Sequence, residues 1–192
     1  PAQDSAAACA RAEELYKEGV ALSDGSIREE FAYQKAIEAC PSHAESRNAL
    51  GVVYVIQKKW GMAESEFRRA TEVKPDFAKA WFNLGSLYEQ SGEFTRAIDA
   101  FLAAIDADKS YVKSYPRLAG LYLRFGNEEA AIQHYERMLQ VGDDADAHYQ
   151  LGVLYWKKGD KPRAGGHIQQ AVKLNPDLLN KPEAGRIISA AF

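Results

Sequence analysis

Four histidines and two cysteines are the side chains of this 192-residue chain that could hold a metal ion or act as nucleophiles. The histidines are His43, His134, His148 and His167, and none has a second histidine or a cysteine at the spacing of a metal site. We therefore expect all four to face solvent, with no metal site and no cofactor. No glycine-rich phosphate loop follows a predicted strand, so the sequence also predicts a protein that is not an enzyme.

The two cysteines could form a disulfide. Cys9 lies at the start of the first predicted helix and Cys40 at the end of the second, and these ends are neighbours in an antiparallel hairpin. We favour a disulfide over two separate buried thiols, and such a crosslink would contribute about 3 to 4 kcal/mol. It would place the protein in the periplasm or outside the cell, whereas two free thiols would return it to the cytoplasm. A lipid attached to Cys9 is a further alternative.

Composition limits the possible partners. Hydrophobic residues make up 46% of the chain and charged residues 27%, so the chain can bury a core. The net charge of −3 gives no attraction to nucleic acid or to anionic lipid, and no apolar run is long enough for a transmembrane segment. The chain begins at Pro1, and we expect a fragment or a mature form whose targeting segment has been removed.

The sequence repeats with a period close to 34 residues. Leucine, then a small residue, then tyrosine recur in four predicted first helices, at Leu50, Leu84, Leu118 and Leu151, at Gly51, Gly85, Ala119 and Gly152, and at Tyr54, Tyr88, Tyr122 and Tyr155. The second helices repeat an alanine at Ala63, Ala97, Ala131 and Ala164, and a large residue at Phe67, Phe101, Tyr135 and Ile168. Small residues let two helices approach closely, and large ones fill the space between hairpins.

This pattern resembles the tetratricopeptide repeat. The resemblance rests on Trp81, Leu84, Gly85, Tyr88, Ala97, Phe101 and Ala104, which we expect to be buried between hairpins. It implies an all-α, right-handed solenoid of antiparallel hairpins, forming a single domain over residues 1–192. We expect a degenerate repeat at about 9–43, repeats at 44–77, 78–111, 112–144 and 145–178, and a capping helix at about 181–192.

Two features depart from the family pattern. Pro75 and Pro176 close the first and last full repeats, but Lys109 and Asp143 stand at the same place in the other two. In the degenerate repeat, the glycine and the proline imply registers about two residues apart.

The resemblance also implies where a partner binds. First helices line the concave side of such a stack, and their side chains outside the packing stripe face the groove. These candidate binding residues are Asn48, Val52, Ile56, Lys79, Phe82, Asn83, Ser86, Gln90, Lys113, Arg117, Arg124, Tyr149 and Trp156. Apolar anchors mixed with basic and amide groups are typical of a peptide-docking surface. The alternative is that Phe82, Trp156 and Ile56 pack against the adjoining helix.

Co-chaperone members of the family grip a C-terminal carboxylate with five polar side chains. Asn83, Lys113 and Arg117 resemble three of them, whereas Asn48 and Val52 occupy the other two places. Val52 cannot donate a hydrogen bond. The resemblance to this carboxylate clamp is therefore partial.

The sequence predicts a non-catalytic scaffold that binds a peptide or partner protein in its groove, in bacterial envelope assembly. The envelope setting depends on the cysteine pair, on the absence of a leader and on the frequent use of this family there. One alternative is a self-associating structural protein in which the apolar segment from Ile187 to Phe192 joins copies. Another is a cytosolic co-chaperone-like module that binds acidic C-terminal peptides.

Overall fold

The computed structural model describes residues 5–191, without the side chain of Ala191. These residues form α-helices and one short 3-10 helix, with no strand among them. The helices are α1 (Ala6–Leu22), α2 (Ile27–Ala39), α3 (Ala44–Ile56), α4 (Trp60–Val73), α5 (Ala78–Ser91), α6 (Phe94–Ala107), α7 (Ser114–Arg124), α8 (Glu128–Val141), α9 (Ala145–Lys157), α10 (Lys161–Leu174), η1 (Pro176–Asn180) and α11 (Pro182–Ala191). The all-helical prediction is confirmed.

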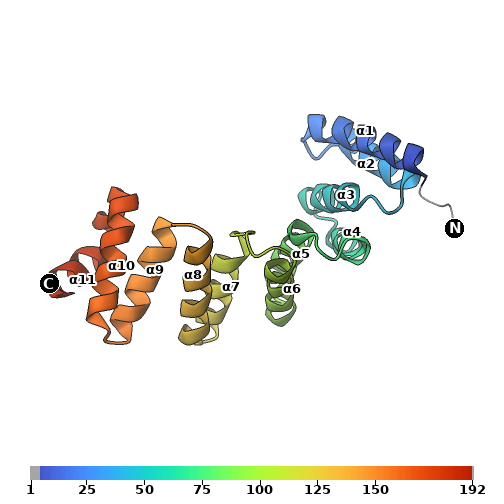
Figure 1. Cartoon of the computed structure of the whole chain (residues 1–192). Helices are drawn as coiled ribbons and strands as arrows, with labels where there is room; N and C mark the ends of the chain where they lie inside the picture. The colour runs from blue at the N-terminus through green and yellow to red at the C-terminus, as the bar shows by residue number, and fades with distance from the viewer. Residues whose placement is uncertain (1–4, 192) are drawn as a thin grey trace. The chain divides into compact units, whose positions relative to one another are not determined.

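Consecutive helices pair into hairpins, from α1–α2 to α9–α10 (Figure 1). The hairpins fall into two compact units, residues 1–111 with α1 to α6 and residues 112–192 with α7 to α11. Within the first unit, α2 packs on α3 and α4 packs on α5, and within the second α8 packs on α9. One continuous domain over residues 1–192 stays a prediction.

The small residue of each first helix lets the two helices of its hairpin touch. A Cβ atom built on Gly85 would lie 2.8 Å from the Phe101 ring, although real Cβ contacts essentially never fall below 3.0 Å. The same close approach recurs between Gly51 and Phe67 and between Gly152 and Ile168, both at 2.6 Å. A larger side chain at these glycines would therefore push the helices apart.

The packing stripe of the 78–111 repeat is buried as predicted, with one exception. Leu84, Tyr88 and Phe101 are almost inaccessible to solvent, but Trp81 is only half-buried. Its indole N–H donates to the Pro75 carbonyl oxygen at 2.9 Å. The expectation that Trp81 is buried is wrong because the small residue Ala100 helps to line a cavity of about 440 Å³ beside the ring.

Two equivalent positions of each full hairpin differ in chemistry from repeat to repeat. The first lies three places before the repeated leucine and the second lies 19 places after the first, and we call the two residues the cross-helix pair. In α3–α4 the pair is Arg47 and Glu66, whose Nη1 and Oε2 atoms are 3.0 Å apart. The corresponding residues of the other hairpins are Trp81 with Ala100, Tyr115 with His134, and His148 with His167. The fold fixes the positions of these pairs, but it does not fix their chemistry.

The prediction of solvent-facing histidines is wrong. His134 is buried and stacks on Tyr122, with ring centroids 5.4 Å apart. Burial, together with the nearby Arg137 charge, lowers the pKa of His134 to about 4. His148 and His167 are half-buried and contact each other across their hairpin. These histidines are held inside hairpins because the cross-helix positions face the partner helix.

The first hairpin has a shorter connection than the others. Tyr33 follows Gly19 by 14 residues, whereas Phe67 follows Gly51 by 16. The contact is nevertheless the same, since a Cβ atom on Gly19 would lie 2.5 Å from the Tyr33 ring. The two-residue difference in register seen in the sequence is therefore taken up between α1 and α2.

Glu29 stabilises this shorter connection. It lies four residues before Tyr33, where the full repeats have alanine, and it is buried. Its carboxylate accepts the backbone N–H groups of Asp24 at 2.9 Å and Gly25 at 2.7 Å. A buried carboxylate is tolerated here because it bonds the amides of the turn.

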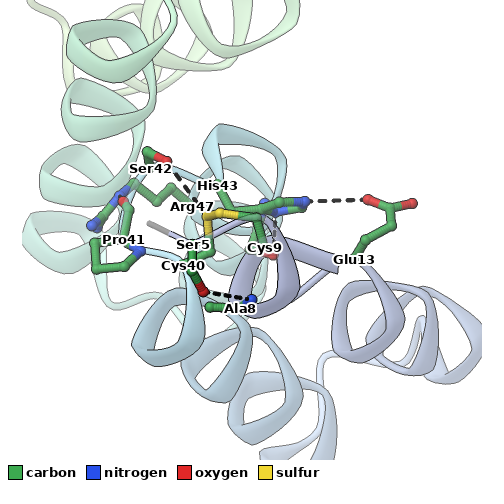
Figure 2. The surroundings of a disulfide bond; sticks show 10 residues. Ser5, Ala8, Cys9, Glu13, Cys40, Pro41, Ser42, His43 and Arg47 are labelled. Atoms are coloured by element: carbon green, nitrogen blue, oxygen red, sulfur yellow. Dashed lines mark hydrogen bonds and ion pairs between the residues drawn. A yellow bond between two sulfur atoms is a disulfide. The ribbon is translucent and has the colours of Figure 1, made fainter. Parts of the chain in front are cut away.

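The cysteines meet at the end of the first hairpin (Figure 2). A disulfide joins Cys9 near the start of α1 to Cys40 at the end of α2, with Cα atoms 4.9 Å apart. His43, beside this disulfide, accepts the Ser46 N–H and so caps α3. Its other ring nitrogen lies 3.2 Å from a Glu13 carboxylate oxygen. The geometry of the cysteine pair is thus compatible with the predicted disulfide.

A terminal helix covers the last hairpin. Helix α11 packs on α10 and, less extensively, on α9, and Ala184 and Ile187 are fully buried. Ile187, which belongs to the segment predicted to join copies, is therefore buried inside its own unit. Phe192, the last residue of that segment, lies outside the described residues.

Candidate functional site

The first helices α3 and α5 line a hollow within the first unit. This cavity of about 170 Å³ is bounded by Val52, Val55, Phe67, Asn83, Ser86, Leu87 and Gln90. Four of these residues, Val52, Asn83, Ser86 and Gln90, belong to the predicted binding set. The structure therefore brings side chains from two successive repeats together around one cavity, which we call the α3/α5 groove.

A second cleft adjoins the α3/α5 groove. It has a volume of about 350 Å³ and is lined by Trp60, Gly61, Glu64, Leu87, Tyr88, Gln90, Ser91 and Glu93. Leu87 and Gln90 line both hollows and so connect them. The combined surface runs from α3 across α5 to the start of α4.

Several apolar side chains around these hollows are exposed. Val52, which lines the α3/α5 groove, is 38% exposed, and Ile56, which lines neither hollow, is 58% exposed one turn further along α3. Trp60, the first residue of α4, is 42% exposed. Exposed apolar side chains grouped beside a cavity mark a surface that can bind another apolar surface.

Amide and hydroxyl groups occupy the same region. Asn83 Nδ2 donates to Asn48 Oδ1 at 2.8 Å, and Asn48 is buried. The Asn83 side chain also has a carbonyl oxygen and a second N–H. Ser86 donates to the Phe82 carbonyl oxygen at 2.9 Å. The groove thus combines apolar walls with an amide that can bond a peptide backbone.

The other predicted site residues of α5 differ from one another. Phe82 is half-buried, and its ring contacts Phe101 and Tyr111 with centroids 5.6 and 5.5 Å apart. Lys79 is exposed. Phe82 therefore packs within its own repeat, whereas Lys79 extends toward solvent.

The remaining predicted residues belong to the second unit. Lys113, Arg117 and Arg124 are exposed at the start of α7 and along it. Tyr149 is buried, and its hydroxyl donates to Glu183 of α11 at 2.8 Å. Burial, together with the hydrogen bond to Glu183, raises the pKa of this phenol to about 12.

Trp156 on α9 is half-buried, and the Lys161 ammonium lies 6.0 Å from its ring. The thirteen predicted residues are therefore divided between the two units. Within the first unit, four of them meet at the α3/α5 groove, namely Val52, Asn83, Ser86 and Gln90.

Several residues that line the two hollows are absent from the predicted set, among them Leu87 and Trp60. Leu87 lies three residues after the repeated Leu84, and it lines both hollows. Trp60 begins α4, and a large aromatic residue at a helix start was the signal that the sequence offered. Trp60 was missed because the groove positions were taken from first helices alone, and Leu87 because it lies outside the places that the family pattern names.

The described part of the chain, residues 5–191, has neither a metal-ligand cluster nor a membrane-spanning helix. No group of three or more histidine, cysteine, aspartate or glutamate side chains there could hold a metal ion. In the same part, every helix is too short or too polar to cross a membrane.

Comparison with known proteins connects this fold to one family. Three family models described as tetratricopeptide repeat match residues 32–65, 59–112 and 145–178, which together cover more than half of the chain. No curated protein sequence matches it.

Solved structures share the fold. MamA is 24% identical with a TM-score of 0.70, and the match covers 85% of this chain and 95% of MamA. YrrB, described as "a TPR protein with an unusual peptide-binding site", is 21% identical with a TM-score of 0.67 and coverages of 90% and 92%. PilF of Pseudomonas aeruginosa is 18% identical with a TM-score of 0.73 and coverages of 96% and 90%.

Proposed function

Because the chain belongs to the tetratricopeptide repeat family, we propose that it is a non-catalytic scaffold that binds a protein partner through the α3/α5 groove. The observation that carries this proposal is the meeting of Val52, Asn83 and Gln90 at one cavity with exposed apolar neighbours. The partner is a peptide segment that presents apolar side chains to Val52, Ile56 and Trp60.

The chemistry of the groove supports this class of partner. Apolar walls provide affinity through burial, and a small number of polar groups fixes orientation. Asn83 supplies both a donor and an acceptor for the peptide backbone. The fold that the chain shares with YrrB, whose peptide-binding site is part of its description, adds support for a peptide as the ligand.

The test is peptide selection followed by variants of the groove. Peptides selected from a displayed library on the full chain are labelled, and their affinity is measured by fluorescence anisotropy. Val52→Lys places a charge beside the cavity and should weaken binding at least about tenfold. Asn83→Ala should weaken it by a smaller factor.

Val73→Lys is the matched control, because Val73 is 41% exposed on α4 and lines neither hollow of the site, against 38% for Val52. It should leave the affinity within about twofold of the original. Equal affinities for the Val52 and Val73 variants would place the binding surface elsewhere.

We also propose the periplasm of a bacterium as the compartment, with envelope assembly as the setting. The support is the disulfide geometry of Cys9 and Cys40, since disulfides persist in oxidising compartments. Alkylation of denatured, unreduced protein taken from its native cell should label no thiol. Labelling of both cysteines would contradict this assignment and favour the cytoplasm.

A further inference from the structure

The last hairpin is bridged by two histidines. His148 of α9 and His167 of α10 place their Nδ1 atoms 2.9 Å apart, which is a hydrogen-bond distance. Both side chains are half-buried between the two helices. A hydrogen bond between two imidazole nitrogens needs one donor and one acceptor, so a single proton lies between the rings.

The geometry of the bridge fits a proton and not a metal ion. The ring centroids are 5.1 Å apart and the nitrogens 2.9 Å apart, so both nitrogens lie near the line that joins the rings. Their lone-pair directions therefore point at each other. A metal ion at its usual distance of about 2.0 to 2.1 Å from each nitrogen does not fit on that line, whereas a proton does.

A neighbouring carboxylate determines which of the two rings accepts the hydrogen bond. The other nitrogen of His148, Nε2, lies 3.3 Å from Asp143 Oδ1. A carboxylate accepts hydrogen bonds, so His148 carries its proton on Nε2 and presents the lone pair of Nδ1 to His167. His167 then donates from Nδ1.

We propose that the His148–His167 bridge is an acid-sensitive latch of the α9–α10 hairpin. His167 can take up one more proton on its Nε2 atom while the bridge persists. A second proton must enter at Nδ1 of His148, and two N–H groups then face each other between two cationic rings. The bridge breaks at that point, and the hairpin loses the contact that joins its helices there.

The groups around the bridge do not relieve the repulsion between the two facing N–H groups and the two cationic rings. Tyr155 of α9 stacks on His167, with ring centroids 5.6 Å apart. Burial lowers the pKa of His167, followed by the His148 charge, while Glu136 of α8 raises it and Arg163 of α10 lowers it. Gln170 of α10 donates to the second oxygen of Asp143 at 3.1 Å and holds that carboxylate in place.

The α3–α4 hairpin provides an internal reference. Its corresponding residues, Arg47 and Glu66, carry opposite charges and form an ion pair at 3.0 Å. An arginine keeps its proton throughout the range in which histidines titrate. The reference hairpin therefore has no bridging histidine whose protonation would open it.

Native-state hydrogen exchange of the full chain tests the proposal. Protection factors are measured from about pH 7.5 to about pH 5, the range in which histidine titrates, and are corrected for the intrinsic exchange rate. Below about pH 6.5, protection of residues 145–174 should fall at least about tenfold per pH unit, since the open hairpin binds at least one proton more than the closed hairpin. Protection of residues 44–73 should change much less.

Variants distinguish the effect of the bridge from a general loss of protection at low pH. His148→Arg with His167→Glu transfers the chemistry of the reference pair and should remove the extra pH dependence of residues 145–174. His167→Gln should also remove it, which keeps the test valid if the double variant does not fold. His134→Phe, in hairpin α7–α8, should leave it unchanged. An equal fall in both hairpins, or a fall that survives His167→Gln, would overturn the proposal.

Discussion

Hairpins α3–α4 and α9–α10 place different chemistry at the same two positions. Arg47 and Glu66 form a buried ion pair in the first, and His148 and His167 share a proton in the second. The small residue of the first helix and the large residue of the second helix touch in the same way in both. The packing stripe therefore builds the hairpin in both cases, while the cross-helix pair differs between them in charge and in its capacity to bind protons.

Removing one partner of the charged pair is the strongest test of this difference. The side chains of Arg47 and Glu66 are 10% and 13% exposed, so Glu66→Ala leaves a buried guanidinium without its carboxylate. We expect the free energy of unfolding to fall by about 3 to 5 kcal/mol. Urea unfolding followed by circular dichroism measures this change.

Glu38→Ala is the control, because the Glu38 carboxylate is 65% exposed in its pair with Lys35. Exposed ion pairs contribute little, so its effect should stay below about 1 kcal/mol. Similar losses in the two variants would mean that burial of the Arg47–Glu66 pair does not determine its contribution.

The first hairpin contains a disulfide, so the stabilisation from a covalent link can be compared with that from the ion pair. Its disulfide joins residues 31 apart in the sequence. Replacing Cys9 and Cys40 together by alanine should lower the free energy of unfolding by about 3 to 4 kcal/mol, because the unfolded chain gains freedom. Hydrogen exchange should locate the loss in residues 6–39. An unchanged midpoint in urea would show that the crosslink does not stabilise this hairpin.

Hairpin α7–α8 isolates the effect of one buried histidine. The pKa of His134 is about 4, compared with an ordinary value of 6.5. Between these values the unfolded chain binds more protons than the folded chain, so stability falls as the pH is lowered from about 6.5 toward 4. The loss approaches about 3 kcal/mol and levels off below that range.

His134→Phe should remove this share of the acid sensitivity. Thermal unfolding of both proteins at a series of pH values measures the difference between them. His43→Gln, at the start of α3, is a comparison in a different hairpin and should leave the His134 share in place. If the original protein and the His134 variant lose stability in parallel, burial of His134 does not carry the effect.

The sequence predicted the hairpins well because one period fixes both helices of each repeat. It could not predict the exposure of Trp81, which depends on the small residue Ala100 across the hairpin. The histidine pair was also missed, although an interval of 19 residues between His148 and His167 was visible. That interval has meaning only once the register between two helices is known.

The groove was predicted in part for a similar reason. Positions on first helices follow from the repeat, and Asn83 indeed lies at a cavity. Trp60, at the start of a second helix, lines the adjoining cleft because of how α4 packs against α5, and the repeat period does not specify that packing.

The smallest expected effect lies in the turns of the compared hairpins. Gly159 ends α9 with a φ of 79°, and Lys58 stands at the corresponding place after α3 with a φ of 60°. Glycine adopts this left-handed conformation without strain, whereas a side chain costs about 1 to 2 kcal/mol. Lys58→Gly should therefore raise the free energy of unfolding by up to about 1 kcal/mol, since glycine also loses more entropy on folding.

Gly159→Ala is the reverse change and should lower stability by a similar amount, about 1 kcal/mol. The two variants are compared by urea unfolding at constant pH. Opposite signs would mean that the two turns have the same backbone requirement although their hairpins differ in chemistry. A destabilising Lys58→Gly would instead mean that the lysine side chain contributes contacts that outweigh its backbone strain.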